Sequence, residues 1–151
     1  MKRFLLVWIS ISAMLLASCS FLSDSEPESG FLLYYLNEDL DQLETKAYVP
    51  SAAETAALVS EVAAMQKAGP PDQKLRSLLP EEVSILDTQL EGSTLTVDFN
   101  TAYTTMTVGR EMLVRGGLVR EFLQIIGVER VIFTVEGEPL TDSYGNEIGM
   151  M

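Results

Sequence analysis

The side chains in this 151-residue chain that could do chemistry are 22 carboxylates, five tyrosines and a single cysteine, and histidine is missing. Without histidine the chain lacks the usual general base near neutral pH and the commonest metal ligand. Serine triads and thiol–imidazole dyads are therefore excluded, and the sequence contains no glycine-rich phosphate loop or Cys/His zinc pattern. Carboxylates alone do not predict a hydrolase, because such a site also needs a cleft that raises one pKa. We expect a protein that is not an enzyme and that has no cofactor.

The single cysteine, Cys19, follows Leu16-Ala17-Ser18 at the end of an apolar run, Phe4 to Leu16, that begins just after Lys2-Arg3. This layout is typical of a secretory signal, and the position of the cysteine matches the bacterial lipoprotein signal. The run is shorter than the roughly 20 residues that a membrane-spanning helix needs. We predict that residues 1–18 are removed and that the Cys19 thiol carries a lipid. The alternatives are a plain signal peptide or a short core segment with a buried cysteine.

On this interpretation the protein is anchored to the cell membrane through Cys19 and lies on the extracytoplasmic face, because two acyl chains hold a protein stably on a bilayer. Residues 19–30 are rich in Ser, Asp, Glu, Pro and Gly, a composition typical of a flexible tether. Residues 31–140 have the length of one domain, and residues 141–151 form a C-terminal tail.

The charge of the predicted mature chain limits its partners. Two of the ten basic residues lie in the signal, so eight basic residues remain against 22 acidic ones, a net charge of −14. Nucleic acid is not expected as a partner, because phosphate chains require clustered Lys and Arg. The same charge opposes flat adsorption on anionic lipid. A basic partner is one use of this acidity, and a solvated surface that keeps the protein soluble is the other.

The first half of the domain predicts a hairpin and a helix. The apolar run Phe31–Leu36 indicates a strand covered on both faces, and Thr45–Val49 indicates a shorter return strand. Ser51-Ala52-Ala53-Glu54 has the pattern of a capping box at a helix start. We therefore predict a helix over residues 52–68, ended by Gly69-Pro70-Pro71.

The second half predicts a hairpin, a helix and a last strand. Residues 85–91 and 94–99 flank a short turn, and the second run alternates between apolar and polar side chains. A helix is expected over about 109–126 with Gly127 as its C-cap, followed by a strand over 131–135. The order of elements indicates an α+β two-layer sandwich, with both helices on one face of a mixed four- to five-stranded sheet.

Three residues are candidates for a partner surface: Tyr103, Gly116 and Gly117. Tyr103 lies in a loop and is the better exposed candidate among the tyrosines, although a loop aromatic folds more often over the edge of the core. Each glycine costs a helix about 1 kcal/mol against alanine. Either close approach of the helix to the sheet or a partner's docking groove would explain that cost.

Two acidic segments, Asn37–Asp41 and Asp142–Glu147, gather oxygen ligands of the kind that calcium prefers. Neither has the spacing of an EF-hand, and an ordinary solvated turn is the alternative for each. We predict no metal-binding residues.

Several segments also occur in an order and spacing known from one family. They are Leu33-Tyr34-Tyr35-Leu36-Asn37, Gly69-Pro70-Pro71, Leu78-Leu79-Pro80, Leu95-Thr96-Val97-Asp98-Phe99-Asn100, and Gly127-Val128-Glu129-Arg130-Val131 leading to Val135-Glu136-Gly137. Behind a lipoprotein signal, this series resembles the GerMN domain of sporulation and spore germination lipoproteins, over nearly all of Phe31 to Leu140. The resemblance implies an envelope lipoprotein of endospore-forming or related Gram-positive bacteria. It also implies a small α+β interaction domain that acts in spore development or germination, and it specifies no reaction.

The sequence and the resemblance together predict a lipid-anchored, non-catalytic module that binds another envelope or spore-assembly protein. A lipoprotein that binds a small ligand or a cation is the first alternative, and an apolar pocket with convergent polar groups would favour it. A carboxylate-dependent hydrolase of envelope glycan is the second, and two carboxyls facing each other across a groove would favour it. A flat face or an edge strand would favour the interaction module.

Overall fold

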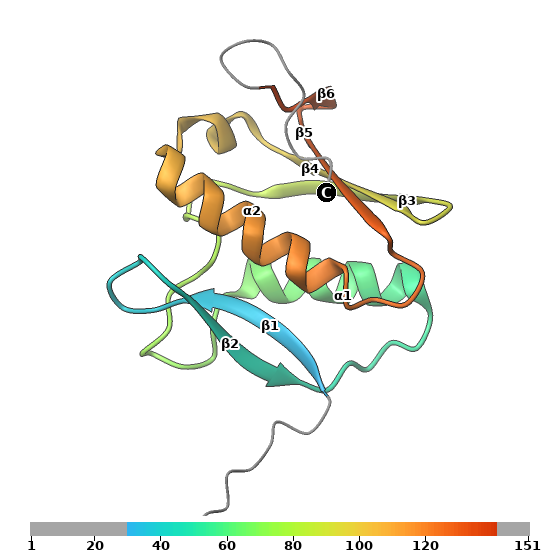
Figure 1. Ribbon diagram of the computed structural model, residues 1–151, viewed down its shortest axis with the longest axis horizontal. Helices are drawn as coiled ribbons and strands as arrows, with labels where there is room; N and C mark the ends of the chain where they lie inside the picture. Colours follow the sequence, from blue (N-terminus) through green and yellow to red (C-terminus); the bar gives the residue numbers. More distant parts are fainter. Residues whose placement is uncertain (1–29, 142–151) are drawn as a thin grey trace, which may run out of the picture.

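A computed structural model of the chain describes residues 30–141 (Figure 1). The helices and strands of this part are, in chain order, β1 (Phe31–Leu36), β2 (Leu43–Tyr48), α1 (Thr55–Ala68), β3 (Ile85–Glu91), β4 (Thr94–Phe99), the 3₁₀ helix η1 (Thr101–Thr105), α2 (Val108–Phe122), β5 (Arg130–Val135) and β6 (Glu138–Pro139). The predicted α+β class is confirmed. Cys19 and the acidic segment 142–147 lie outside the described residues.

The larger sheet has four strands in the order β3-β4-β5-β6. β3 and β4 form the predicted antiparallel hairpin with the predicted bounds, and β4 pairs with β5 in parallel. Leu95, Val97 and Phe99 of β4 are fully buried, because their alternation places all three on the face that carries the helices. The mixed four-stranded sheet expected from the sequence is therefore present, and its fourth strand is the short β6, which the sequence pattern did not indicate.

The first hairpin forms a sheet of its own. β1 and β2 pair along their whole length, from Phe31 with Tyr48 to Leu36 with Leu43, and neither strand joins the larger sheet. The larger sheet therefore does not gain a fifth strand from this hairpin. The physical reason is that side chains and a loop, described below, take the hydrogen bonds that a further strand would have made to β1.

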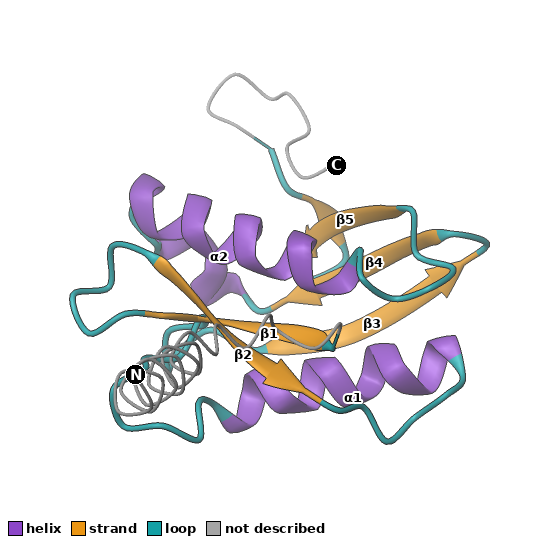
Figure 2. Cartoon of the chain, turned by 60° about the horizontal axis from the view of Figure 1, so that its bottom comes forward, coloured by secondary structure: helices purple, strands orange, loops and turns teal. Residues whose placement is uncertain are grey.

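The two helices lie between the two sheets. Figure 1 shows both helices on one face of the four-stranded sheet, as predicted, with the β1–β2 hairpin on their far side. In the turned view of Figure 2, α2 lies on one side of the hairpin and α1 on the other, so the hairpin packs where the two helices meet. The hairpin touches both helices, since Tyr48 bonds to Glu61 of α1 and Leu43 approaches Gly117 of α2.

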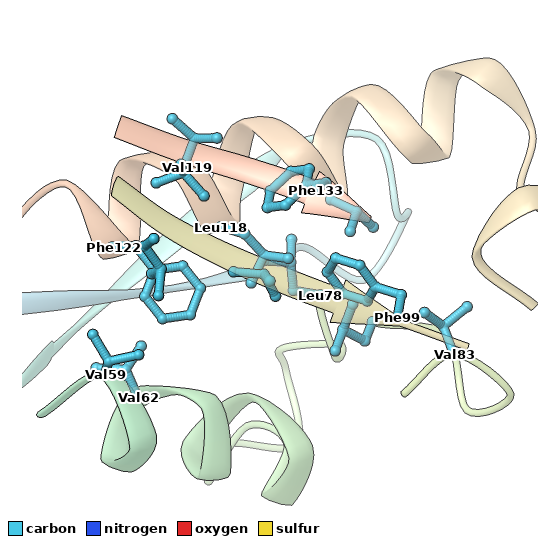
Figure 3. Packing of buried hydrophobic residues seen from close by; sticks show 14 of the residues in the cluster. Val59, Val62, Leu78, Val83, Phe99, Leu118, Val119, Phe122 and Phe133 are labelled. Atoms are coloured by element: carbon cyan, nitrogen blue, oxygen red, sulfur yellow. The ribbon is translucent and has the colours of Figure 1, made fainter. Parts of the chain in front are cut away.

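The core fills the space between the helices and the larger sheet. In Figure 3, Phe122 of α2 faces Val59 and Val62 of α1, and all three side chains are buried. Phe99 of β4 packs edge-on against Phe133 of β5, with ring centroids 5.5 Å apart. This contiguous apolar cluster holds both helices against the sheet through the hydrophobic effect.

The start of α1 differs from the prediction. The helix begins at Thr55, not at Ala52, and Glu54 is its N-cap, with a carboxylate that accepts from the backbone N–H groups of Ala56 and Ala57. Ser51 does not form the predicted capping box, because its hydroxyl donates to Glu61 one turn and a half into the helix. The end of the helix at Gly69 is confirmed, and this glycine has a φ of 78°.

The end of α2 also differs. The helix stops at Phe122, four residues before the predicted end, and the chain continues in tighter turns to Gly127, which has a φ of 97°. Bonds from Gln124 N to Glu121 O and from Ile125 N to Phe122 O replace the α-helical pattern. The side chain of Gln124 bonds to the backbone of β1, which holds the turns after α2 against this strand.

Candidate functional site

Tyr103, the predicted exposed tyrosine, is buried. Only 1% of its surface is exposed, its ring centroid lies 4.5 Å from that of Phe99, and its hydroxyl donates to Glu111 Oε1 over 3.0 Å. Burial, together with the charge of Glu111, raises the pKa of this phenol above its ordinary value. The prediction of an exposed Tyr103 is therefore wrong, and the alternative, a ring folded over the core, is what the structure contains.

Gly117 is a point of close approach. A Cβ atom at this position would lie 2.8 and 3.0 Å from the two Cδ atoms of Leu78 and 3.2 Å from Cδ2 of Leu43. Close packing therefore explains this glycine, and its neighbours are β2 and the loop before β3 instead of the larger sheet. Gly116 is different, because a Cβ there would meet nothing within 4 Å. Packing gives no reason for Gly116.

The acidic turn Asn37–Asp41 closes on itself. The Asn37 side chain donates to Asp41 Oδ1 over 2.7 Å and accepts from the backbone N–H groups of Asp41 and Gln42. These bonds are those of a self-contained hairpin turn. No group of three potential metal ligands comes together within residues 30–141.

A row of buried and half-buried polar side chains lines the inner edge of β1, the edge that β2 does not use. Gln124 Oε1 accepts from Leu32 N over 2.9 Å, and Gln124 Nε2 donates to Leu32 O over 2.8 Å. Glu121 Oε1 accepts from Tyr34 N over 2.9 Å, and Gln66 Nε2 donates to Tyr34 O over 3.0 Å. Side chains from α1, from α2 and from the turn after α2 thus supply the bonds that a neighbouring strand would normally make.

The row continues with backbone atoms at the end of the strand. Leu36 N donates to Arg76 O over 2.9 Å, and Arg76 N donates to Leu36 O over 2.8 Å. The inner edge of β1 is therefore bonded at each alternate residue from Leu32 to Leu36. Sequence reasoning missed this arrangement. The available signal was a polar Gln66 and a charged Glu121 among apolar helix residues, a pattern that is common on exposed helix faces as well.

Glu121 and Gln66 are the buried polar residues of the described part, with 0% and 1% of their surfaces exposed. Gln66 Nε2 also donates to Glu121 Oε1 over 2.8 Å, so this oxygen accepts two bonds. Burial raises the pKa of the Glu121 carboxyl to about 8, although both bonds act in the opposite direction. With this pKa the carboxyl is mostly protonated near neutral pH, and its other oxygen, Oε2, is buried without a hydrogen-bond partner among the described residues.

A second carboxylate, Glu61 of α1, ties the β2–α1 connection to the helix. It accepts bonds from the Tyr48 hydroxyl, from the backbone N–H and hydroxyl of Ser51, and from Ala52 N. These donors stabilise the ionised carboxylate and hold the pKa of Glu61 at about 2, and the backbone N–H of Ser51 has the largest effect. Near neutral pH Glu61 is therefore ionised while Glu121 is mostly neutral, and both position the hairpin against the helices.

The face of the larger sheet that points away from the helices is open. Alternation and register place Thr94, Thr96 and Asp98 of β4 on this face, beside the exposed Asp87, Gln89 and Glu91 of β3. Asp98 accepts from Thr134 Oγ1 and from Gly137 N, which orders the turn between β5 and β6.

The border of this face is acidic. Glu136 and Glu138 lie exposed at the β5–β6 turn, Asp87 and Glu91 lie along β3, and Arg130 of β5 is the basic residue in register with Thr94. β3 is the edge strand on this side of the sheet, since it pairs with β4 alone. We call the outward side chains of β3, β4 and β5 the open sheet face.

A shallow depression near β2 is lined by Lys46, Pro71, Asp72, Gln73 and Lys74. It is largely open to solvent and does not have the enclosed form that a small-ligand site usually has. No helix of the described residues is long and apolar enough to cross a bilayer.

Residues 32–141 match the family Germane, described as sporulation and spore germination, and the chain therefore belongs to this family. The first GerMN domain of the sporulation protein GerM from Bacillus subtilis is similar over 77% of this chain and 91% of that chain, with 14% identity and a TM-score of 0.55. The tandem GerMN domains of the same protein match 78% of this chain and 42% of that chain, with 19% identity and a TM-score of 0.49. A comparison with curated proteins found no match. The predicted GerMN resemblance is thus confirmed, and at these identities the structures show the fold alone.

Proposed function

We propose that the chain is a lipid-anchored, non-catalytic interaction module that holds another envelope or spore-assembly protein near the outer face of the cell membrane. Membership of the Germane family supports a role in sporulation or germination. The observation that carries the proposal is the open sheet face, because both helices and the first hairpin lie on the opposite side of the larger sheet.

The open sheet face suits a protein partner with a basic surface. Its threonines lie around the half-buried Ile132 of β5, and exposed acids at Asp87, Glu91, Glu136 and Glu138 surround this floor. Opposite charge on a partner would steer it to this face and raise the association rate. β3 offers a seven-residue edge to which a strand of the partner can add.

Site-specific photocrosslinking in the native cells tests this surface. A photoreactive residue replaces either Gln89, on the open sheet face, or Gln73, a glutamine after α1 that is also exposed. We expect a crosslinked partner from position 89 and none from position 73, and we expect the charge reversal Glu91→Lys to reduce the yield at least about tenfold. Equal crosslinking at both positions would contradict the proposed surface, and so would a crosslinking yield that Glu91→Lys leaves unchanged.

The lipid anchor is tested separately through Cys19. Cys19→Ser removes the thiol that would carry the lipid, so the variant is expected to leave the membrane fraction and to migrate differently on a denaturing gel. Ser18→Ala keeps the cysteine and is the control, with unchanged partitioning expected. A Cys19→Ser chain that still sediments with membranes at unchanged mobility would rule out the anchor.

A further inference from the structure

Three large apolar side chains are exposed together at one end of the domain. Ile126 is 92% exposed, Val49 is 87% exposed and Leu123 is 41% exposed. Val49 directly follows β2, and Leu123 and Ile126 lie in the turns after α2. We call these three residues the apolar end.

Hydrogen bonds and strand register bring these segments together. Gln124 is bonded to Leu32 at the start of β1, and Phe31 is paired with Tyr48, the residue before Val49. α2 runs antiparallel to β1, since Gln124 meets Leu32 while Glu121 meets Tyr34. Ile126 therefore lies beyond the start of β1. Val49, which follows the partner of Phe31, also lies beyond the start of this strand. Figure 1 shows the start of β1, the end of β2 and the end of α2 at this end of the molecule.

The covalent chain connects the same end to the predicted anchor. β1 begins at Phe31, and eleven residues separate it from Cys19. Eleven residues span at most about 40 Å when fully extended. If Cys19 is lipid-modified, the apolar end is the part of the domain that the chain holds nearest to the bilayer.

We propose that Val49, Leu123 and Ile126 rest in the interfacial layer of the bilayer that anchors the chain. This inference depends on the lipid anchor of the proposed function. Three apolar side chains bind a membrane weakly by themselves, but a tether converts their binding into an intramolecular step at high effective concentration. The contact orients the domain and directs the open sheet face away from the anchor point.

The acidity of the chain restricts this contact to the apolar end. The 22 acids oppose approach of the whole surface to anionic lipid. Another strongly exposed apolar pair, Val108 and Met112, lies at the opposite end of α2 and is 77% and 60% exposed. These two residues are far from the start of β1 and provide an internal control of matched chemistry.

Tryptophan fluorescence tests the contact, because the chain has a single tryptophan, Trp8. Chains with either Ile126→Trp or Val108→Trp are expressed from the full sequence and purified after their native N-terminal processing, and Trp8→Phe removes the emission of Trp8 from any chain that keeps its signal segment. They are reconstituted on phosphatidylcholine vesicles with and without brominated acyl chains. We expect quenching at position 126 at least about threefold stronger than at position 108, with a blue-shifted emission at position 126. Val49→Trp serves as a second reporter and should behave like Ile126→Trp.

Co-sedimentation of the same samples separates the two proposals. Vesicle-bound chains with equal, weak quenching at positions 126 and 108 would overturn the membrane contact and leave the anchor standing. A blue shift at position 126 that grows with protein concentration, without quenching by brominated lipid, would show that a second copy covers this end. That result would also overturn the proposal. Chains that do not co-sediment at all would overturn the anchor and the contact together.

Discussion

At the scale of single residues, the most consequential side chain is Glu121. It lies fully buried at the centre of the row that binds the inner edge of β1, and one of its oxygens receives both Tyr34 N–H and the Gln66 amide. A buried polar group that loses its partners costs about 1–3 kcal/mol. Glu121, Gln66 and Gln124 therefore make the hairpin position specific, because no apolar residue could accept or donate these bonds.

The raised pKa of Glu121 predicts a loss of stability as the pH rises from about 4.5 to about 8. Between its ordinary value of 4.5 and about 8, the folded chain holds a proton that the unfolded chain releases. The free energy of unfolding should therefore fall as the pH rises through this window, by up to about 1.4 kcal/mol per pH unit from this group. Glu121→Gln keeps an oxygen for both donors but cannot ionise, so it should flatten the slope. Urea denaturation at about pH 5.5 and about pH 8.5 measures the difference.

The exposed Glu44→Gln on β2 is the matched control for this prediction. It removes a carboxylate from the surface of the same hairpin. The free energy of unfolding of this variant should change between the two pH values as much as that of the wild type. If Glu121→Gln and Glu44→Gln show the same pH dependence, ionisation of Glu121 does not govern the stability of the hairpin.

At the scale of secondary-structure elements, α2 is shaped by its contact with the hairpin. Gly117 allows Leu78 and Leu43 to pack directly on the helix backbone, and the neighbouring Gly116 faces open space. The two glycines therefore offer a matched pair of substitutions in one helix. Their opposite environments separate the effect of packing from the effect of helix propensity.

Gly117→Ala should destabilise the domain and Gly116→Ala should stabilise it. Alanine favours the helix by about 1 kcal/mol at both positions. At Gly117 the new methyl group would overlap the fully buried Leu78, and overpacking of this kind costs about 1–3 kcal/mol. Thermal unfolding of both variants measures the sign, and a net loss of about 1 kcal/mol at Gly117 is expected against a gain of similar size at Gly116. A stabilised Gly117→Ala would show that Leu78 moves freely, against the close-packing explanation.

At the scale of the whole molecule, the two sides of the domain have different characters. The first hairpin and the apolar end lie on the side from which the chain continues toward Cys19, and the open sheet face lies on the far side of the helices. In the proposed orientation, the acidic border of the open sheet face is available to a partner while the domain stays on its membrane. The photocrosslinking and fluorescence experiments described above test the two ends of this arrangement independently.

Much of this architecture is encoded in local patterns of the sequence. The alternation of β4, the turn at Gly92 and the glycine at the end of α1 each depend on a few neighbouring residues, and each was predicted correctly. The GerMN resemblance and the α+β class follow from the order of such segments. The predicted start of α1 was wrong because the Ser51 hydroxyl bonds to Glu61, a tertiary partner that competes with the local capping pattern.

The sequence by itself determined the class of fold, the bounds of the β3–β4 hairpin and the acidity of the chain, because these depend on composition and on short periodic patterns. Only the tertiary structure decided that the first hairpin stands apart, that Tyr103 is buried and that Gln124 binds Leu32. The last contact joins residues 92 positions apart in the chain. A polar helix residue looks the same in sequence whether it faces water or the edge of a buried strand, so its role becomes defined only when packing brings that strand to it.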